Sequence, residues 1–457
     1  MKAMGKIPSN LIGRYRDAVA LALAIGCSGP VAQERAIVER PEDTGQAALV
    51  AKFGKEPLLT LDSVLARVTS RNPELKMWEA KVQSREALAK GAKALMPPEI
   101  GVGGLDLPYG MAMEKADTMG GAVESPPGEQ ALMISVQQMF PGWGKREARS
   151  RWLGSLAGQD KAGGRWMKVQ LLADAKRQYY LAATADRKLS VLSEAEAVMD
   201  YMLKVAETRF KFRRADLATV QEAKARLKEL ATMRIMEIST RRQALSALQL
   251  LMADTSQSGF SVDTSLGLNG YASRTLESTR VQGRYDLDQT DESIKAMELN
   301  REWMARQNRP DFGLRFEHME MFDMGERRYS VMGMMTLPFM PWSSGMARSE
   351  TVGMAKDIES MREESKAKRL MALKMARETL IMLQAEVEQS DRFKLEVVPA
   401  YRNALDASMA AYQEGSGDLF RVLDIWDRWI MGRMTALEHF GKALALEADY
   451  ERDSGTR

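Results

Sequence analysis

Residues 135–141 of the sequence read SVQQMFP, and 200 residues further on residues 335–341 read MTLPFMP. Each stretch ends a segment of alternating apolar and polar residues and leads into a long segment with helical periodicity. Upstream of each, Pro98–Val102 (PEIGV) is matched by Pro310–Leu314 (PDFGL). Similarity that recurs in the same order indicates an internal repeat. We therefore expect two copies of one unit: a helix, two strands, a very long helix, a turn and a helix.

The segments after these strands have the composition of unusually long helices. No Gly or Pro occurs between Arg165 and Ser258, where apolar residues recur every three or four positions. Reading outward to the nearest turn signals predicts helices over 145–212 and 346–413, each about 68 residues or roughly 100 Å long. Helices of this length must pack as long antiparallel hairpins, since globular helices average about 12 residues. Shorter helices are predicted over 61–93, 217–252, 291–307 and 419–450.

Four strands are predicted over 98–107, 130–140, 310–321 and 328–339. In the third strand, Phe312, Leu314 and Phe316 alternate with polar residues and glycine. Strands of about 10–12 residues with this alternation are typical of a transmembrane barrel, although a soluble sheet with one wet face has the same pattern. The order of the elements favours the membrane interpretation. Four strands cannot close a barrel, and open edges are not tolerated in lipid, so several copies must share one barrel.

Composition excludes several kinds of site. Lys plus Arg is 65 and Asp plus Glu is 62, so the charge balance gives no reason to expect nucleic acid. One cysteine and two histidines exclude a disulfide framework and a Cys/His zinc site. No nucleophile is paired with a base and no phosphate-binding loop occurs, so we expect neither an enzyme nor a bound cofactor.

The N-terminus has the pattern of an export signal. Residues 1–26 combine four basic residues with the short apolar run 18–26, which is too short to span a bilayer. Cys27 follows at once in the sequence AIGC. This context resembles a bacterial lipobox, in which the cysteine carries the lipid; the alternative is an ordinary signal peptide followed by a chance cysteine. Residues 27–58 are polar and suit an N-terminal tether.

The remaining boundaries follow from the repeat. The first repeat covers 59–252, with its β-hairpin at 98–140 and its turn at 209–217. An inter-repeat linker covers 253–290, and a tail covers 451–457. The second repeat covers 291–450, with its β-hairpin at 310–340 and its turn at 412–419.

Five short motifs resemble the TolC family of outer-membrane efflux channels. They are LTLD at 59–62, NPEL at 72–75, QMFPGWGK at 138–145, LPF at 337–339 and YQEGSGDL at 412–419. The resemblance implies a mostly α fold with a small membrane β part. Each chain would add four strands to a 12-stranded β-barrel, shared by a homotrimer in outer-membrane lipid, and hairpins to a periplasmic α-helical tunnel. It also implies two partners, a periplasmic adaptor (membrane fusion) protein and an inner-membrane pump of the RND or related type.

In such a channel the two helix turns would form the periplasmic tip, where the gate or the adaptor contact lies. Charged side chains at the tip could hold it closed by ion pairs. The alternative is that they are solvated turn residues, with Asp216 and Asp418 acting as helix N-caps. The candidate tip residues are Arg209, Arg213, Arg214, Asp216, Leu217, Tyr412, Glu414, Gly415, Gly417, Asp418 and Leu419.

Methionine is unusually frequent, at 33 of 457 residues. Thioether sulfur suits Cu(I), and His318, Met319 and Met321 form the most ligand-like stretch. The alternative is that methionine acts here as a flexible core residue. Segments such as MFPGWGK at 139–145 and MPW at 340–342 resemble most the heavy-metal (CusC-like) branch of the family, which implies copper or silver as cargo.

Three functions remain open from the sequence. The first is a passive efflux channel for heavy-metal ions or small toxic molecules, and the second is the exit duct of a type I protein secretion system. The third is a soluble periplasmic coiled-coil scaffold. A scaffold would stay in solution without detergent once its signal and lipid were removed, whereas either channel would not.

Overall fold

The computed structural model describes residues 57–105, 131–212, 216–256, 259–273, 275–276, 281–321, 327–342, 344–414 and 417–455. The predicted signal peptide, Cys27 and the tip residues Arg213, Arg214 and Gly415 lie outside these ranges. The chain divides into two compact units. The first unit contains residues up to 66 together with 175–273 and 382–447. The second unit contains 67–174, 274–381 and 448–457.

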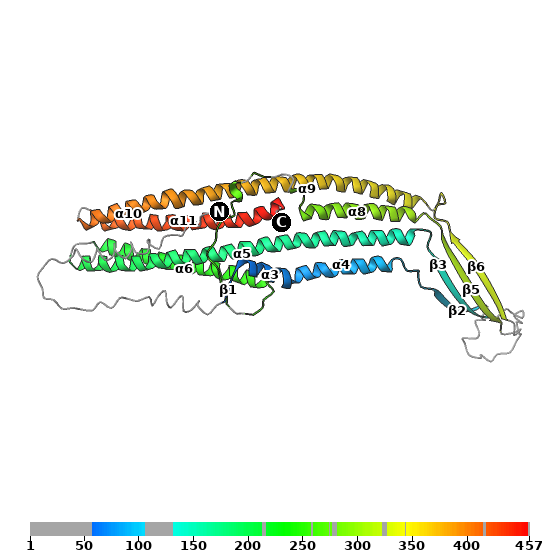
Figure 1. Cartoon of the computed structure of the whole chain (residues 1–457). Coiled ribbons are helices and arrows are strands. Elements are labelled where there is room, and N and C mark those ends of the chain that lie inside the picture. The colour runs from blue at the N-terminus through cyan, green and yellow to red at the C-terminus, as the bar shows by residue number, and fades with distance from the viewer. Residues whose placement is uncertain are drawn as a thin grey trace, which may run out of the picture. The chain divides into compact units, whose positions relative to one another are not determined.

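The order of elements repeats, as the sequence predicts (Figure 1). In each half a helix leads to two strands, a long helix and a second helix. The first half contains α3 (Leu61–Arg71), α4 (Pro73–Gly91), β2 (Glu99–Leu105), β3 (Ala131–Phe140), α5 (Lys145–Lys211) and α6 (Leu217–Leu251). The second half contains α8 (Tyr285–Arg306), β5 (Asp311–Met321), β6 (Arg327–Thr336), α9 (Gly345–Arg392), a π-helical turn (Phe393–Val397), α10 (Val398–Gln413) and α11 (Leu419–Ser454).

Two of the predicted helices are interrupted. The segment 61–93 breaks at Asn72, whose side-chain Oδ1 accepts a hydrogen bond from the Glu74 amide at 2.9 Å, and α4 starts with Pro73. Asparagine at the N-cap and proline at the first position both favour a helix start. The segment 346–413 contains the π-helical turn, which ends at Val397, two residues before Pro399. Proline has no amide hydrogen to donate to the preceding turn, and a wider turn accommodates this loss.

Three boundaries differ from the prediction by three residues or more, and one of them is the end of α11, which continues to Ser454 where a tail was expected over 451–457. The helix expected from residue 291 begins at Tyr285. Asp286 and Asp288 lie in its first turn, where negative side chains stabilise the helix by interacting with the positive end of its dipole. The last strand ends at Thr336 rather than at 339. Pro338 explains this end, because a proline cannot donate to a strand ladder.

The second unit contains an antiparallel sheet with the strand order β2-β3-β5-β6. The register aligns Ile100 with Val136, Val136 with Phe316, and Phe316 with Val331. These four side chains therefore lie in one row on one face, and all four are exposed. The predicted alternation in β5 is confirmed, because Arg315 and Glu317 lie on the other face. We call the apolar face the outer face and the other the inner face.

Glycine and lysine shape the junction between β3 and α5. A side chain at Gly142 would come within 2.3 Å of the carbonyl oxygen of Pro310, and Gly144 has a positive φ of 76°. Lys145 follows and is buried, and its Nζ lies 2.7 Å from Oδ1 of Asp311. The same oxygen accepts a hydrogen bond from the Gly142 amide at 2.7 Å. Asp311 begins β5, so this contact joins the first repeat to the second.

The helices of the second unit pack closely where glycine allows it. A side chain at Gly163 would come within 2.8 Å of the Trp78 ring, and Trp152 stacks on Trp303 with ring centroids 5.0 Å apart. The four glycines at 154, 158, 163 and 164 therefore do not end α5, which runs unbroken for 67 residues. At Gly163 the absence of a side chain instead allows close helix contact.

The core of the first unit lies between α5, α6, α10 and α11. Leu192 and Met199 of α5 pack with Leu423, Trp426 and other buried residues of one cluster. A short parallel pair, β1 (Leu58–Leu59) with β4 (Ser261–Val262), also belongs to this unit. The buried Tyr179 hydroxyl donates to the Leu59 carbonyl oxygen and accepts from the Asp263 amide, both at 3.0 Å.

Replacing Lys145 by methionine tests the strand-to-helix junction. The Lys145→Met change leaves the apolar stem in place but removes the charge that pairs with Asp311. We expect the free energy of unfolding to fall by about 2 kcal/mol, the scale of a hydrogen bond between charged groups. Guanidinium unfolding of the detergent-solubilised chain measures this. Lys356→Met is the matched control, because Lys356 pairs with Glu359 on the surface and its loss should leave the midpoint unchanged.

Candidate functional site

The two faces of the sheet differ in chemistry. The inner face carries an ion pair between Arg315 and Glu317 at 2.7 Å, and Ser330 donates to Glu317 at 3.1 Å. The outer face has exposed Ile, Val, Leu and Phe side chains along all four strands, and Phe316 stacks on Tyr329 with centroids 6.4 Å apart. One face therefore suits lipid and the other suits water.

Exposed tryptophans follow the sheet at equivalent places of the two repeats. Trp143 comes after β3 and Trp342 comes after β6, and their exposed fractions are 82% and 84%. The Trp143 ring lies 6.0 Å from the Phe312 ring on the outer face. Indole rings with this exposure favour the boundary between lipid and water. No helix within the described ranges is long and apolar enough to cross a bilayer.

The predicted ligand stretch is divided between the two faces. His318 lies on the outer face opposite Tyr329, whereas Met319 and Met321 lie on the inner face. Alternation along β5 therefore separates the imidazole from both thioethers. Among the described residues no group of three His, Cys, Asp or Glu side chains could hold a metal ion.

At the tip, an aromatic contact joins the two turns. The Arg209 guanidinium lies 4.1 Å from the centroid of the Tyr412 ring, which is cation–π geometry. Burial raises the pKa of the Tyr412 phenol, and the nearby Arg209 charge opposes this rise. The Arg209 side chain thus reaches from the first repeat to the second.

The two aspartates at the turns behave differently. The Asp418 carboxylate accepts from the Phe420 amide at 3.2 Å and caps α11. Asp216 occupies the N-cap position of α6, but its side chain makes no capping bond. Gly417 packs closely, since its amide donates to the Ala411 carbonyl oxygen at 2.9 Å and a side chain there would meet the Tyr412 backbone. Glu414 is the C-cap of α10.

Apolar side chains are also exposed at the tip. Phe212, Leu217 and Phe420 expose 73%, 53% and 54% of their surface, whereas Leu419 is buried in the core of the first unit. Exposed apolar groups at two adjacent turns favour contact with another protein.

Sequence reasoning missed a set of ion pairs that link helices beyond the turns. Arg226 on α6 lies 3.4 Å from Asp427 on α11, and Arg433 lies 3.0 Å from Glu194. Burial raises the pKa of Asp427, and the Arg226 charge opposes the rise. Arg226 and Asp427 lie ten and nine residues after Asp216 and Asp418. The unequal offsets mean that the repeat alone does not predict this pair, which depends on how α6 packs against α11.

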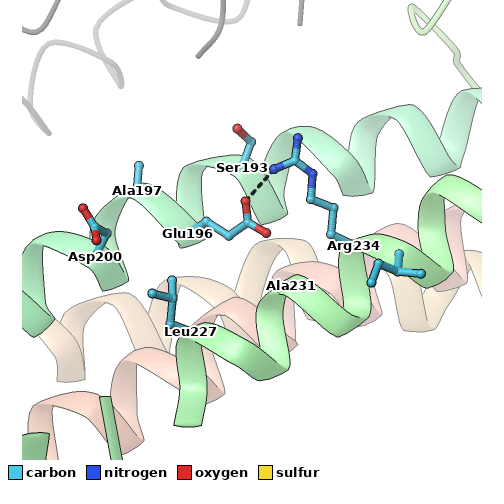
Figure 2. Close-up of a pocket in the computed structure, with 8 residues that line it drawn as sticks. Ser193, Glu196, Ala197, Asp200, Leu227, Ala231 and Arg234 are labelled. Atoms are coloured by element: carbon cyan, nitrogen blue, oxygen red, sulfur yellow. Dashed lines mark hydrogen bonds and ion pairs between the residues drawn. The ribbon is translucent and has the colours of Figure 1, made fainter. Parts of the chain in front are cut away.

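A groove of about 800 Å³ runs between α5 and α6 (Figure 2). The close-up shows Arg234 of α6 reaching Glu196 of α5, and the two side chains form an ion pair of 2.7 Å. Leu227 and the exposed Ile235 provide apolar surface beside this pair. The groove combines apolar and charged groups, as protein-binding surfaces do.

The two N-cap positions give a matched test. Asp418→Ala should lower the free energy of unfolding by about 1 kcal/mol, because it removes a capping hydrogen bond. Asp216→Ala should have a clearly smaller effect, because the Asp216 side chain makes no such bond. Hydrogen exchange of the first-turn amides of α11 and α6 measures both. Equal loss of protection in the two variants would contradict the difference between these caps.

Comparisons with known proteins agree with this geometry. No protein-family model matches the chain, and no curated protein matches it. Solved structures do match. CusC has a TM-score of 0.70 and 15% identity, over 86% of this chain and 92% of CusC. The outer-membrane channel CmeC of Campylobacter jejuni has a TM-score of 0.68 and 13% sequence identity, over 86% of this chain and 85% of CmeC.

A third solved structure is VceC, an outer-membrane protein of Vibrio cholerae. It has a TM-score of 0.66 and 16% identity, over 86% of this chain and 96% of VceC. At sequence identities this low, the similarity shows a shared fold only. The resemblance to the TolC family is thus confirmed at the level of the fold, and the chain has the fold of outer-membrane efflux channels.

Proposed function

We propose that the chain is the outer-membrane channel subunit of a tripartite efflux system and that it conducts its cargo passively from the periplasm to the exterior. In this proposal three copies form a 12-stranded β-barrel and a periplasmic α-helical tunnel. The observation that carries the proposal is the segregation of the sheet into an apolar outer face and a polar inner face.

The edges of the sheet support a shared barrel. Within the described residues, β2 pairs only with β3 and β6 pairs only with β5. The remaining backbone groups of both edge strands need partners, because lipid supplies none. Pairing β2 of one copy with β6 of the next satisfies both edges and continues the antiparallel alternation. The strands β3, β5 and β6 have 10, 11 and 10 residues, which suits a tilted strand in a bilayer.

The tip supports the proposed partners. The exposed side chains of Phe212, Leu217 and Phe420 and the groove beside Arg234 offer mixed apolar and charged surface to a periplasmic adaptor. An inner-membrane pump of the RND or related type then supplies the energy for transport. Arg209 and Tyr412 belong to the same surface. In the proposal Arg213, Arg214 and Gly415 remain candidates for adaptor contact or for the gate.

For the cargo, we propose heavy-metal ions such as copper or silver. The methionine content and the resemblance to the heavy-metal branch support this choice. Deleting the gene and challenging the strain with copper, silver, zinc and hydrophobic drugs tests it. Sensitivity to drugs alone would replace the metal cargo with small toxic molecules.

Cysteine crosslinking tests the shared barrel. In a Cys27→Ala background, Val102→Cys on β2 and Val331→Cys on β6 should give covalent dimers and trimers in outer membranes treated with bismaleimides of increasing length. The pair Ile134→Cys and Val331→Cys is the matched control, because Ile134 aligns with Val102 on the outer face but belongs to β3, which has a neighbour on both sides, and it should give no such ladder. A chain that purifies as a monomer without detergent would instead support the scaffold.

Planar-bilayer recording tests the pore and its gate together. The wild-type chain should insert as a channel with low conductance, because interhelical pairs such as Arg226–Asp427 hold it closed. Asp427→Asn weakens that link. If the pair contributes about 1 kcal/mol to the closed state, the open fraction should rise about fivefold. The matched control is Asp424→Asn, because Asp424 pairs with Arg428 on its own helix. An unchanged open fraction in Asp427→Asn would remove this pair from the gate.

A further inference from the structure

The methionines of the sheet are not distributed evenly between its faces. We compared the side chains of 99–104, 131–140, 311–321 and 327–336, using the observed strand register. On the outer face Met335 is the single methionine, among Ile, Val, Leu, Phe and Tyr side chains. On the inner face every apolar side chain larger than alanine is a methionine. These residues are Met133, Met139, Met319, Met321, Met332 and Met334.

This distribution does not follow from packing alone. A residue chosen to fill an irregular apolar space would serve equally well on either face. Here the inner face also carries Ser135, Glu317 and Ser330, which suit contact with water. Leucine, isoleucine and valine occur on the outer face and are absent from the inner face within these ranges; just beyond them, Leu105, the last residue of β2, aligns with the inner-face Ala131. The face that suits water thus uses thioethers in place of hydrocarbon side chains.

The methionines lie close enough to act together. Met139 and Met334 lie on either side of Gly313, which has no side chain. A Cβ at Gly313 would lie 2.5 Å from the Met139 sulfur and 3.3 Å from the Met334 methyl carbon. The two side chains therefore meet above the glycine. On the same face Met133 is directly opposite Met319 in the register.

The thioethers follow the strand direction as a ladder. Successive inner-face rows contain Met139 with Met334, then Met332 beside Arg315, then the Ser135–Glu317–Ser330 row, then Met133 with Met319 beside Arg328. Met321 lies in the next row. Side chains on one face repeat about every 7 Å along a strand. A small cation could therefore pass from row to row, with the Arg315–Glu317 ion pair midway.

We propose that this inner-face ladder binds soft monovalent cations, with silver(I) and copper(I) as the matching class, and passes them along the sheet. Thioether sulfur is neutral and prefers such ions. Neutral ligands also hold a cation less tightly than thiolates, so exchange between rows can be fast. No redox or covalent step is involved. The proposal rests on the proposed function, because it requires the inner face to line a pore.

Silver nitrate in planar bilayers is the direct probe, with potassium nitrate as electrolyte so that no silver chloride forms. The full chain should carry potassium current, and silver(I) should reduce it while it occupies the ladder. In the double variant Met139→Leu with Met334→Leu, the silver concentration that halves the current should rise about tenfold, the consequence of losing two soft ligands. Leucine keeps the size and apolarity of these positions, so the potassium current should remain.

Met335→Leu is the matched control, since Met335 lies on β6 next to Met334 but on the outer face. It should keep the silver response of the wild-type chain. The proposed ladder would be overturned if silver nitrate reduced the wild-type potassium current no more than the same concentration of sodium nitrate does. It would also be overturned if the double variant needed the same silver concentration as the wild type to halve the current. Absence of any potassium current from the wild type would instead count against the proposed pore, so the two failures are distinguishable.

Discussion

The backbone of the two edge strands sets the strongest constraint on this molecule. An extended strand in lipid must satisfy every amide and carbonyl group, and a four-stranded sheet leaves two edges open. The exposed outer face adds a second constraint, because apolar side chains are costly to leave in water. The row formed by Ile100, Val136, Phe316 and Val331 is an example. Edge pairing and lipid contact answer both demands only when copies of the chain assemble. The sheet itself therefore supports the oligomer that we propose, without a separate interface.

The junction of β3 and α5 explains how so short a sheet is held to so long a helix. Asp311 contacts Gly142 and Lys145 through one carboxylate oxygen, and the glycine allows the close approach of Pro310. The arrangement orients the start of α5 against the start of β5, so one ion pair fixes a helix of the first repeat to a strand of the second. Because the lysine side chain is 7% exposed, water screens this pair less than it screens an ordinary surface pair.

The periodicity of the helices and strands and the duplication of the chain could be predicted from the sequence, whereas the contacts between the two repeats could not. The alternation along 310–321 and the length of α5 follow from side-chain order alone, and the structure confirms both. The break at Asn72 and the π-helical turn before Pro399 depend on single residues inside strongly periodic segments, so the periodicity conceals them. The contact of Arg226 with Asp427 depends on how α6 packs against α11, which helical periodicity does not determine. The separation of His318 from Met319 was, by contrast, contained in the alternation itself.

Strand alternation also limits what the methionines can do. A shift of one residue in the register would move every inner-face side chain to the outer face, so the position of the thioethers is tied to the pattern that places Phe316 and Val331 on the apolar outer face. The same pattern separates the imidazole of His318 from the sulfur atoms, which leaves a face of neutral, soft ligands around the Arg315–Glu317 pair. A mixed site with histidine would bind more tightly and retain its ion. Thioether ligands without histidine are better suited to a conduit, because weak ligands in successive rows allow a cation to leave as readily as it enters.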